Sequence, residues 1–160
     1  MVQTGDVILK KEGGPISKAI QLYTKSEYSH AALSLGNRII IHSHLFPGVH
    51  MTTIDNFNFE YDIYKFDPPL TEKETIILKF KALDYVGKKY DLTQIIGYLF
   101  FGLKGENHFN SPRKIICSEL IDRLAMEIDR NILPEKKLGD ITPDDLAESD
   151  ELKYYKTYTP

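Results

Sequence analysis

The first part of the chain alternates short apolar runs with Gly, Pro and Asn, a pattern that is typical of β-strands joined by turns. Because successive strand residues point to opposite faces, these runs can cover one side of a sheet with apolar side chains. Strands are expected at residues 7–9, 28–35, 38–43, 49–54 and 61–66.

One of the predicted turns fixes how two of these strands pair. Gly36-Asn37 has the form of a two-residue hairpin turn. Such a turn pairs Leu35 with Arg38 and places His30 opposite Ser43, beside His42. The hairpin therefore predicts that His30 and His42 lie near one another.

The pattern changes after residue 67, where helix signals dominate. Thr71 and Glu74 have the spacing of a capping box, and Gly87 is placed to end a helix that runs to about Val86. Pro143 follows Thr142 as in a capped short helix. Further helices are expected at 15–25, 93–101, 117–130 and 143–147, a loop at 104–113, and a closing strand at 154–158. The order of elements predicts an α+β fold in which helices cover one side of a mostly antiparallel sheet, formed by residues 1–160 as a single domain.

Composition narrows the classes of protein. The chain has 160 residues, 42% of them hydrophobic, and a net charge of −3, so nothing favours a nucleic acid partner, which usually needs a basic face. No leader-like segment is recognised near the N-terminus, which predicts a cytoplasmic location. The longest apolar run, 95–103, is too short for an integral membrane segment. It is interpreted as a buried helix, with an acyl pocket or a lid as the alternative.

Cys117 is the only cysteine, so no disulfide and no cysteine cluster for a metal can form. It stands at the start of a predicted helix, where backbone N–H groups stabilise a thiolate or an oxyanion. A cysteine in this position can act as a nucleophile. The alternative is a structural cysteine, because free cysteine is among the most buried residue types.

Histidines supply the candidate base. His30 begins one predicted strand and His42 ends the next, so one could take a proton and the other could orient it. His44 shares strand parity with His42 and competes for the orienting role. A metal site at His42 and His44 lacks supporting carboxylates and is disfavoured. His50 and His108 are interpreted as surface histidines.

Six short motifs stand out along the chain. They are Gly5-Asp6-Val7-Ile8, His30-Ala31-Ala32-Leu33, Ile40-Ile41-His42-Ser43, Gly87-Lys88-Lys89-Tyr90-Asp91, Cys117-Ser118-Glu119-Leu120 and Ile141-Thr142-Pro143. Together they resemble NlpC-type papain-like peptidases, but the cysteine follows the histidines, which is the order of the circularly permuted papain-like amidases of the YaeF/YiiX group. The resemblance covers roughly residues 5–152.

This resemblance implies a permuted papain-like fold and hydrolysis of an amide bond in a peptide or peptidoglycan-like substrate. Cys117 would form an acyl-thioester, His30 would be the base, and His42 would orient it where the permuted group commonly has Glu. Tyr90 and Ser118 would bind the oxyanion or the substrate. No cofactor and no metal are expected. A thiolate–imidazolium pair would lower the pKa of Cys117 and raise that of His30.

Two other functions fit the same residues. Lecithin:retinol acyltransferase and its relatives also present His, His and then Cys in this order, which allows a lipid acyl substrate, although their N-C-E-H-F signature is absent here. A catalytically silent binding module could also keep this fold. The oligomeric state is not predicted.

Overall fold

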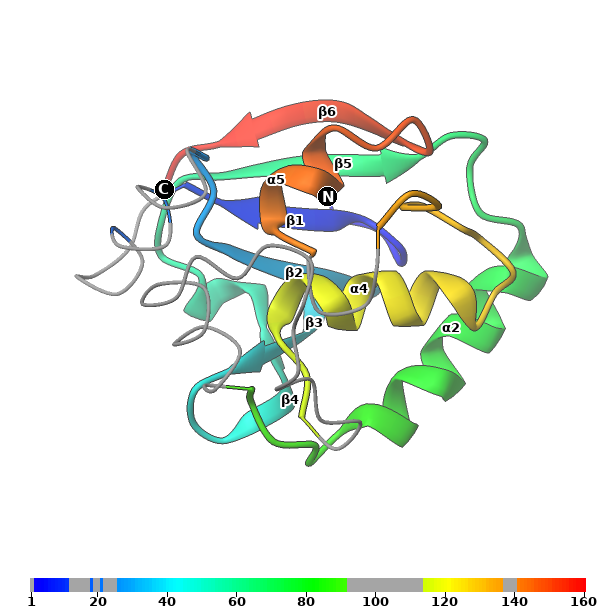
Figure 1. The fold of residues 1–160 in the computed structure, drawn as a ribbon, viewed down its shortest axis with the longest axis horizontal. Coiled ribbons are helices and arrows are strands. Elements are labelled where there is room, and N and C mark those ends of the chain that lie inside the picture. Colours follow the sequence, from blue (N-terminus) through cyan, green and yellow to red (C-terminus); the bar gives the residue numbers. More distant parts are fainter. Residues whose placement is uncertain (1, 12–17, 19–20, 22–25, 92–113, 137–140) are drawn as a thin grey trace.

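A computed structural model describes residues 2–11, 18, 21, 26–91, 114–136 and 141–160 (Figure 1). The helices expected at 15–25 and 93–101, the loop at 104–113 and His108 fall mainly or wholly outside the described residues, so these predictions stay untested.

Six antiparallel strands form one sheet in the order β4-β3-β2-β1-β5-β6 (Figure 1). Every strand expected from the sequence is present, with ends that move by at most two residues. The strands are β1 Val7–Lys10, β2 His30–Gly36, β3 Ile39–His44, β4 Gly48–Thr53, β5 Tyr61–Phe66 and β6 Leu152–Tyr158.

The described helices begin where the sequence signals place them. They are α2 Glu72–Tyr85, α4 Cys117–Met126 and α5 Pro143–Ala147, with a short 3-10 helix, η1, at Ile54–Asn56. The predicted capping box at Thr71 forms before α2, and the predicted cap Thr142 before α5 also forms a capping box, with Asp145. No helix in the described part of the chain is long and apolar enough to cross a membrane.

Helix α4 ends earlier than predicted. The expected end was about Arg130, but Asp129 takes a left-handed conformation with φ 59°. The Arg130 N–H then donates to the Ala125 carbonyl at 3.0 Å, and the Asp129 N–H to that of Met126 at 3.1 Å. This Schellman arrangement closes the helix at Met126 and satisfies its last carbonyls.

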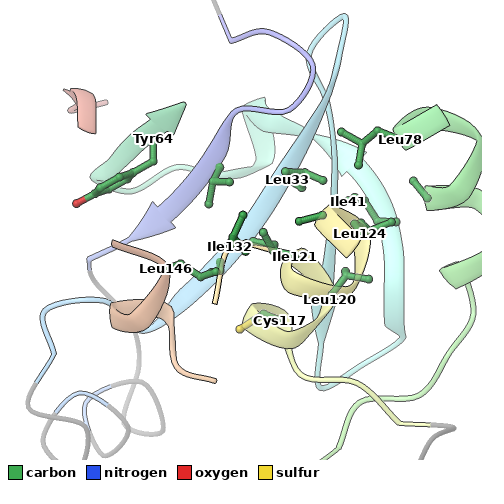
Figure 2. Close-up of a cluster of buried hydrophobic side chains, with 14 of the residues drawn as sticks. Leu33, Ile41, Tyr64, Leu78, Cys117, Leu120, Ile121, Leu124, Ile132 and Leu146 are labelled. Atoms are coloured by element: carbon green, nitrogen blue, oxygen red, sulfur yellow. The ribbon is translucent and has the colours of Figure 1, made fainter. Parts of the chain in front are cut away.

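The main core lies between the sheet and α4 (Figures 1 and 2). Leu33 of β2 and Ile41 of β3 face Leu120 and Leu124 of the helix there, all fully buried. The opposite face of the sheet carries a smaller cluster made by alternate strand residues, including Ala32 and Ile40, together with Phe57, which follows η1. The structure thus confirms helices on one side of an antiparallel sheet.

The β2–β3 register differs from the prediction. Asn37 and Arg38 take left-handed conformations, with φ 50° and 65°, and the register shifts between Ser34 and Gly36. Leu33 therefore pairs with Ile41, so the predicted pairing of His30 with Ser43 is wrong. Continuing this register by one residue puts His42 opposite Ala32. Because one step of register exchanges the two faces, His42 comes to the face that carries His30.

Candidate active site

Cys117 is the first residue of α4, and its side chain is 6% exposed at the edge of the main core (Figure 2). The backbone N–H groups of Ala31 on β2, of Ser118 and of Cys117 itself lie close enough to the sulfur to lower the pKa of the thiol. Burial raises the pKa of the thiol to about 11, and these three donors only partly offset it. The thiol is thus neutral near pH 7, opposite to the direction expected from the sequence.

The segment that leads into Cys117 is held by the sheet. Ser43 on β3 donates to the Ile115 carbonyl at 2.6 Å, and the Ile115 N–H donates to the Lys89 carbonyl at 2.9 Å. Lys89 and Lys114 also form a parallel bridge. These bonds fix where α4 begins, and therefore where the sulfur lies.

Ser118 was predicted to serve the oxyanion or the substrate. Its side chain is fully buried and donates to the Ile141 carbonyl at 2.6 Å. The hydroxyl therefore ties α4 to the segment before α5, and only the backbone N–H of Ser118 is directed at the Cys117 sulfur.

Tyr90 is half-buried on a loop that is anchored to β4. The Val49 N–H donates to the Lys88 carbonyl at 2.8 Å, and the Gly87 N–H donates to the Val49 carbonyl at 2.9 Å. Burial raises the pKa of Tyr90, and the neighbouring charge of Cys117 raises it further. The phenol is therefore within electrostatic reach of the thiol, and it keeps its proton at neutral pH.

His30 and His42 are in direct contact. His30 Nε2 lies 2.8 Å from His42 Nδ1, and both rings pack against Phe57. Burial is the main cause that lowers the pKa of each histidine, and the positive charges that neighbouring histidines would carry lower it further. The pKa of His42 falls to about 3. Both imidazoles are neutral at pH 7, so the expected rise for His30 is also reversed.

The other two described histidines differ from one another. His44 is exposed, and its Nδ1 lies 3.3 Å from the Phe46 carbonyl, so His42 rather than His44 is bonded to His30. His50, interpreted from the sequence as a surface residue, is half-buried and bonds to His42, with 3.0 Å between their Nε2 atoms. The sequence feature that could have predicted this contact is the turn at Pro47-Gly48, which pairs His42 with His50 across β3 and β4.

Cys117 and the histidine pair approach β2 from its two faces. Cys117 belongs to the core on the α4 side, whereas Phe57, which packs on both imidazoles, belongs to the opposite cluster. The described contacts include no hydrogen bond between the Cys117 sulfur and His30. The sulfur instead meets the N–H of Ala31, the residue after His30. The structure thus joins His30 to His42 directly and brings Cys117 to the adjacent residue.

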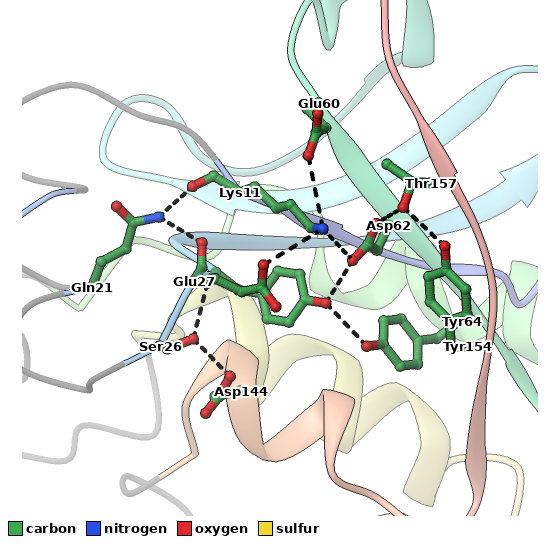
Figure 3. A network of polar contacts seen from close by, with 11 residues as sticks. Lys11, Gln21, Ser26, Glu27, Glu60, Asp62, Tyr64, Asp144, Tyr154 and Thr157 are labelled. Atoms are coloured by element: carbon green, nitrogen blue, oxygen red, sulfur yellow. Dashed lines mark hydrogen bonds and ion pairs between the residues drawn. The ribbon is translucent and has the colours of Figure 1, made fainter.

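A buried polar network holds the chain just before His30 (Figure 3). Asp62 on β5 accepts hydrogen bonds from Tyr28 at 2.6 Å and Thr157 at 2.5 Å, and pairs with Lys11 at 3.0 Å. Burial alone would raise the pKa of Asp62, but these three donors hold it below its usual value. Asp62 is therefore an ionised acceptor that fixes the Tyr28 ring.

Two further hydrogen bonds hold the residues that precede β2. Ser26 donates to Asp144 on α5 at 2.8 Å, which the same figure shows at the edge of the network (Figure 3). The Ser29 N–H donates to the Lys10 carbonyl at 2.9 Å. Because both contacts lie within four residues of His30, the backbone that carries this histidine is rigidly placed at the strand's start.

Comparison with known proteins agrees with this arrangement. A model of the family described as permuted papain-like amidase enzyme, YaeF/YiiX, C92 family, matches residues 1–154. The crystal structure of the metalloprotein yiiX from Escherichia coli O157:H7 is similar to this chain with a TM-score of 0.73 and 20% identity, over 99% of this chain and 98% of that one. No curated protein matches. The chain therefore belongs to the family of permuted papain-like amidases, C92.

Proposed function

We propose that this amidase cleaves peptide-type amide bonds through an acyl-thioester on Cys117, with His30 as the base and His42 as its orienting partner. The observation that carries the proposal is the position of the Cys117 sulfur. It lies among the backbone N–H groups at the start of α4, beside the strand residue that follows His30. A developing negative charge on sulfur or oxygen is stabilised there.

The reaction starts from neutral partners. The thiol proton passes to the free ring nitrogen of His30 while the sulfur attacks the substrate carbonyl, so that charge separates only as the bond forms. The described contacts include no hydrogen bond between these two groups in the resting structure, so the transfer requires that one forms when substrate is bound. The Tyr90 phenol and the N–H groups around Cys117 are the candidate donors to the oxyanion.

The second half of the reaction returns the proton. The His30 imidazolium protonates the leaving amine, the carbon–nitrogen bond breaks, and the acyl group stays on Cys117. Water, deprotonated by His30, then hydrolyses the thioester and restores the thiol. His42 has no negative charge to balance the imidazolium, so its contribution is orientation through the 2.8 Å bond.

No metal is part of this proposal. The similar crystal structure is described as a metalloprotein. In this chain the described residues contain no group of three or more His, Cys, Asp or Glu side chains that could hold a metal ion. We therefore derive no step through a metal. The single domain over residues 1–160 and the cytoplasmic location stay predictions from the sequence.

The proposal is tested with a panel of fluorogenic acyl-amide peptides and, in parallel, phospholipid esters, followed by mass spectrometry of the acylated protein. Cys117→Ala and His30→Ala should each abolish turnover, and the double variant should be scarcely worse, because the two act as one unit. His42→Ala should be milder, and His44→Ala should be silent.

Other outcomes separate the alternatives. Acylation from esters but not from amides would identify a lipid acyl enzyme. A protein that is never acylated, and whose Cys117→Ala variant binds the same peptides equally well, would be a binding module.

A further inference from the structure

A line of hydrogen bonds crosses three strands on the sheet face opposite α4. It runs from His30 on β2 to His42 on β3 at 2.8 Å, and from His42 to His50 on β4 at 3.0 Å. It ends where His50 Nδ1 lies 2.9 Å from the Gly48 carbonyl. The last partner is a backbone oxygen, which can only accept a hydrogen bond.

That fixed acceptor determines the proton positions in the whole line. His50 must carry its proton on Nδ1 to donate to Gly48, so its Nε2 is an acceptor in the neutral ring. His42 must therefore donate from Nε2, which leaves its Nδ1 as an acceptor. His30 must then donate from Nε2, and its Nδ1 holds a free lone pair.

We propose that His50 is a positioning residue of the active site: together with the Gly48 carbonyl it holds His30, through His42, in the tautomer whose Nδ1 is free to act as the base. This inference rests on the proposed function, which assigns the base to His30. It extends the pair of histidines to a line of three with a defined direction.

The same line gives the positive charge a route away from His30. When His30 Nδ1 accepts the thiol proton, its Nε2 proton can pass to His42 Nδ1. The Nε2 proton of His42 then passes to His50 Nε2. Each ring gains one proton and loses one, except His50, which ends as the imidazolium. No other reactant is needed, and the reverse shift returns the proton to the leaving amine.

The charged groups around the three histidines favour transfer of the proton towards His50. Lys10 on the neighbouring strand β1 and His44 on β3 both act to lower the pKa of His30, in addition to burial and to the other two histidines of the line. In the sheet order β4-β3-β2-β1, His50 lies on the strand farthest from Lys10. His42 is buried whereas His50 is half-buried. A charge on His50 is therefore farther from a cation and closer to water.

The tautomers can be read directly from long-range ¹H–¹⁵N spectra of histidine-labelled protein at pH 7.5, without any substrate. In the wild type we expect His30 and His42 as Nε2–H tautomers and His50 as the Nδ1–H tautomer. His50→Phe removes the acceptor and should give mixed tautomers at His42 and His30. His50→Gln is the matched variant, because its amide oxygen can accept from His42 and keep the order.

Kinetics separates orientation from proton transfer. His50→Gln keeps an acceptor but cannot become a cation, so its kcat for amide hydrolysis should fall about tenfold with KM unchanged. His50→Phe should lose more. Wild-type tautomers in a folded His50→Phe variant, or full kcat in both variants, would overturn the proposal. So would wild-type spectra that change on addition of EDTA, because the imidazoles would then hold a metal.

These outcomes are distinct from a failure of the proposed function. If Cys117 is never acylated, the function is wrong whatever the spectra show. If Cys117 is acylated but the tautomers do not depend on His50, only the positioning role is wrong.

Discussion

Acid should destabilise the folded protein through His42. This side chain is 7% exposed, and burial, helped by His50 and His44, lowers its pKa from 6.5 to about 3. Because the folded pKa is lower than the unfolded one, the unfolded chain binds the proton more readily. The stability is therefore complete above about pH 6.5 and is lost as the pH falls towards 3.

The magnitude follows from the shift. Each pH unit below 6.5 costs about 1.4 kcal/mol per such histidine, so His42 alone should remove about 2 kcal/mol between pH 7.5 and pH 5.0. The lowered pKa of His30 adds a loss of the same sign. Asp122 has the opposite effect on stability, because burial and, to a smaller extent, Glu119 raise its pKa to about 6. Its protonation between pH 7.5 and pH 5.0 stabilises the fold by about 1.4 kcal/mol.

Urea unfolding of the wild type and of His42→Gln at pH 7.5 and pH 5.0 isolates the contribution of His42. The double difference cancels the pH-independent cost of the substitution and the contribution of Asp122, and it should be about 2 kcal/mol or more. If both proteins lose the same stability on acidification, His42 is not a buried neutral base and the reasoning is refuted.

Three further predictions follow from single contacts. Iodoacetamide should alkylate free Cys117 slowly at pH 7, because a pKa of about 11 instead of 9.0 leaves about 100-fold less thiolate; a rate that titrates below pH 8 would contradict this. In urea unfolding, Tyr28→Phe should cost about 1.5–3 kcal/mol because its hydroxyl bonds a buried carboxylate, whereas Tyr155→Phe, at an exposed position outside the network, should cost almost nothing; equal losses would refute a special role for the network. Gly48→Ala should destabilise by about 2–4 kcal/mol and Gly87→Ala by about 1, since both have positive φ but only a Cβ at Gly48 would clash with a backbone carbonyl; equal values would exclude the clash.

Local signals in the sequence determined much of the architecture. The Thr71 and Thr142 capping boxes are complete within four residues, so α2 and α5 begin where they were predicted. Alternating apolar residues located the strands to within two residues. The sequence also placed Cys117 at a helix start, because a helix end needs only neighbouring residues to define it.

Tertiary structure decided the register and the electrostatics of the site. The left-handed Asn37 and Arg38 move the turn by one residue, which brings His42 onto the face of His30, and the next hairpin adds His50. Neither the register shift nor the pairing with β4 can be predicted from the apolar pattern of a single strand. The pKa directions of Cys117 and His30 were predicted wrongly for a related reason. Charge pairing can be guessed from residue types, but the desolvation that outweighs it depends on how completely distant segments cover each group.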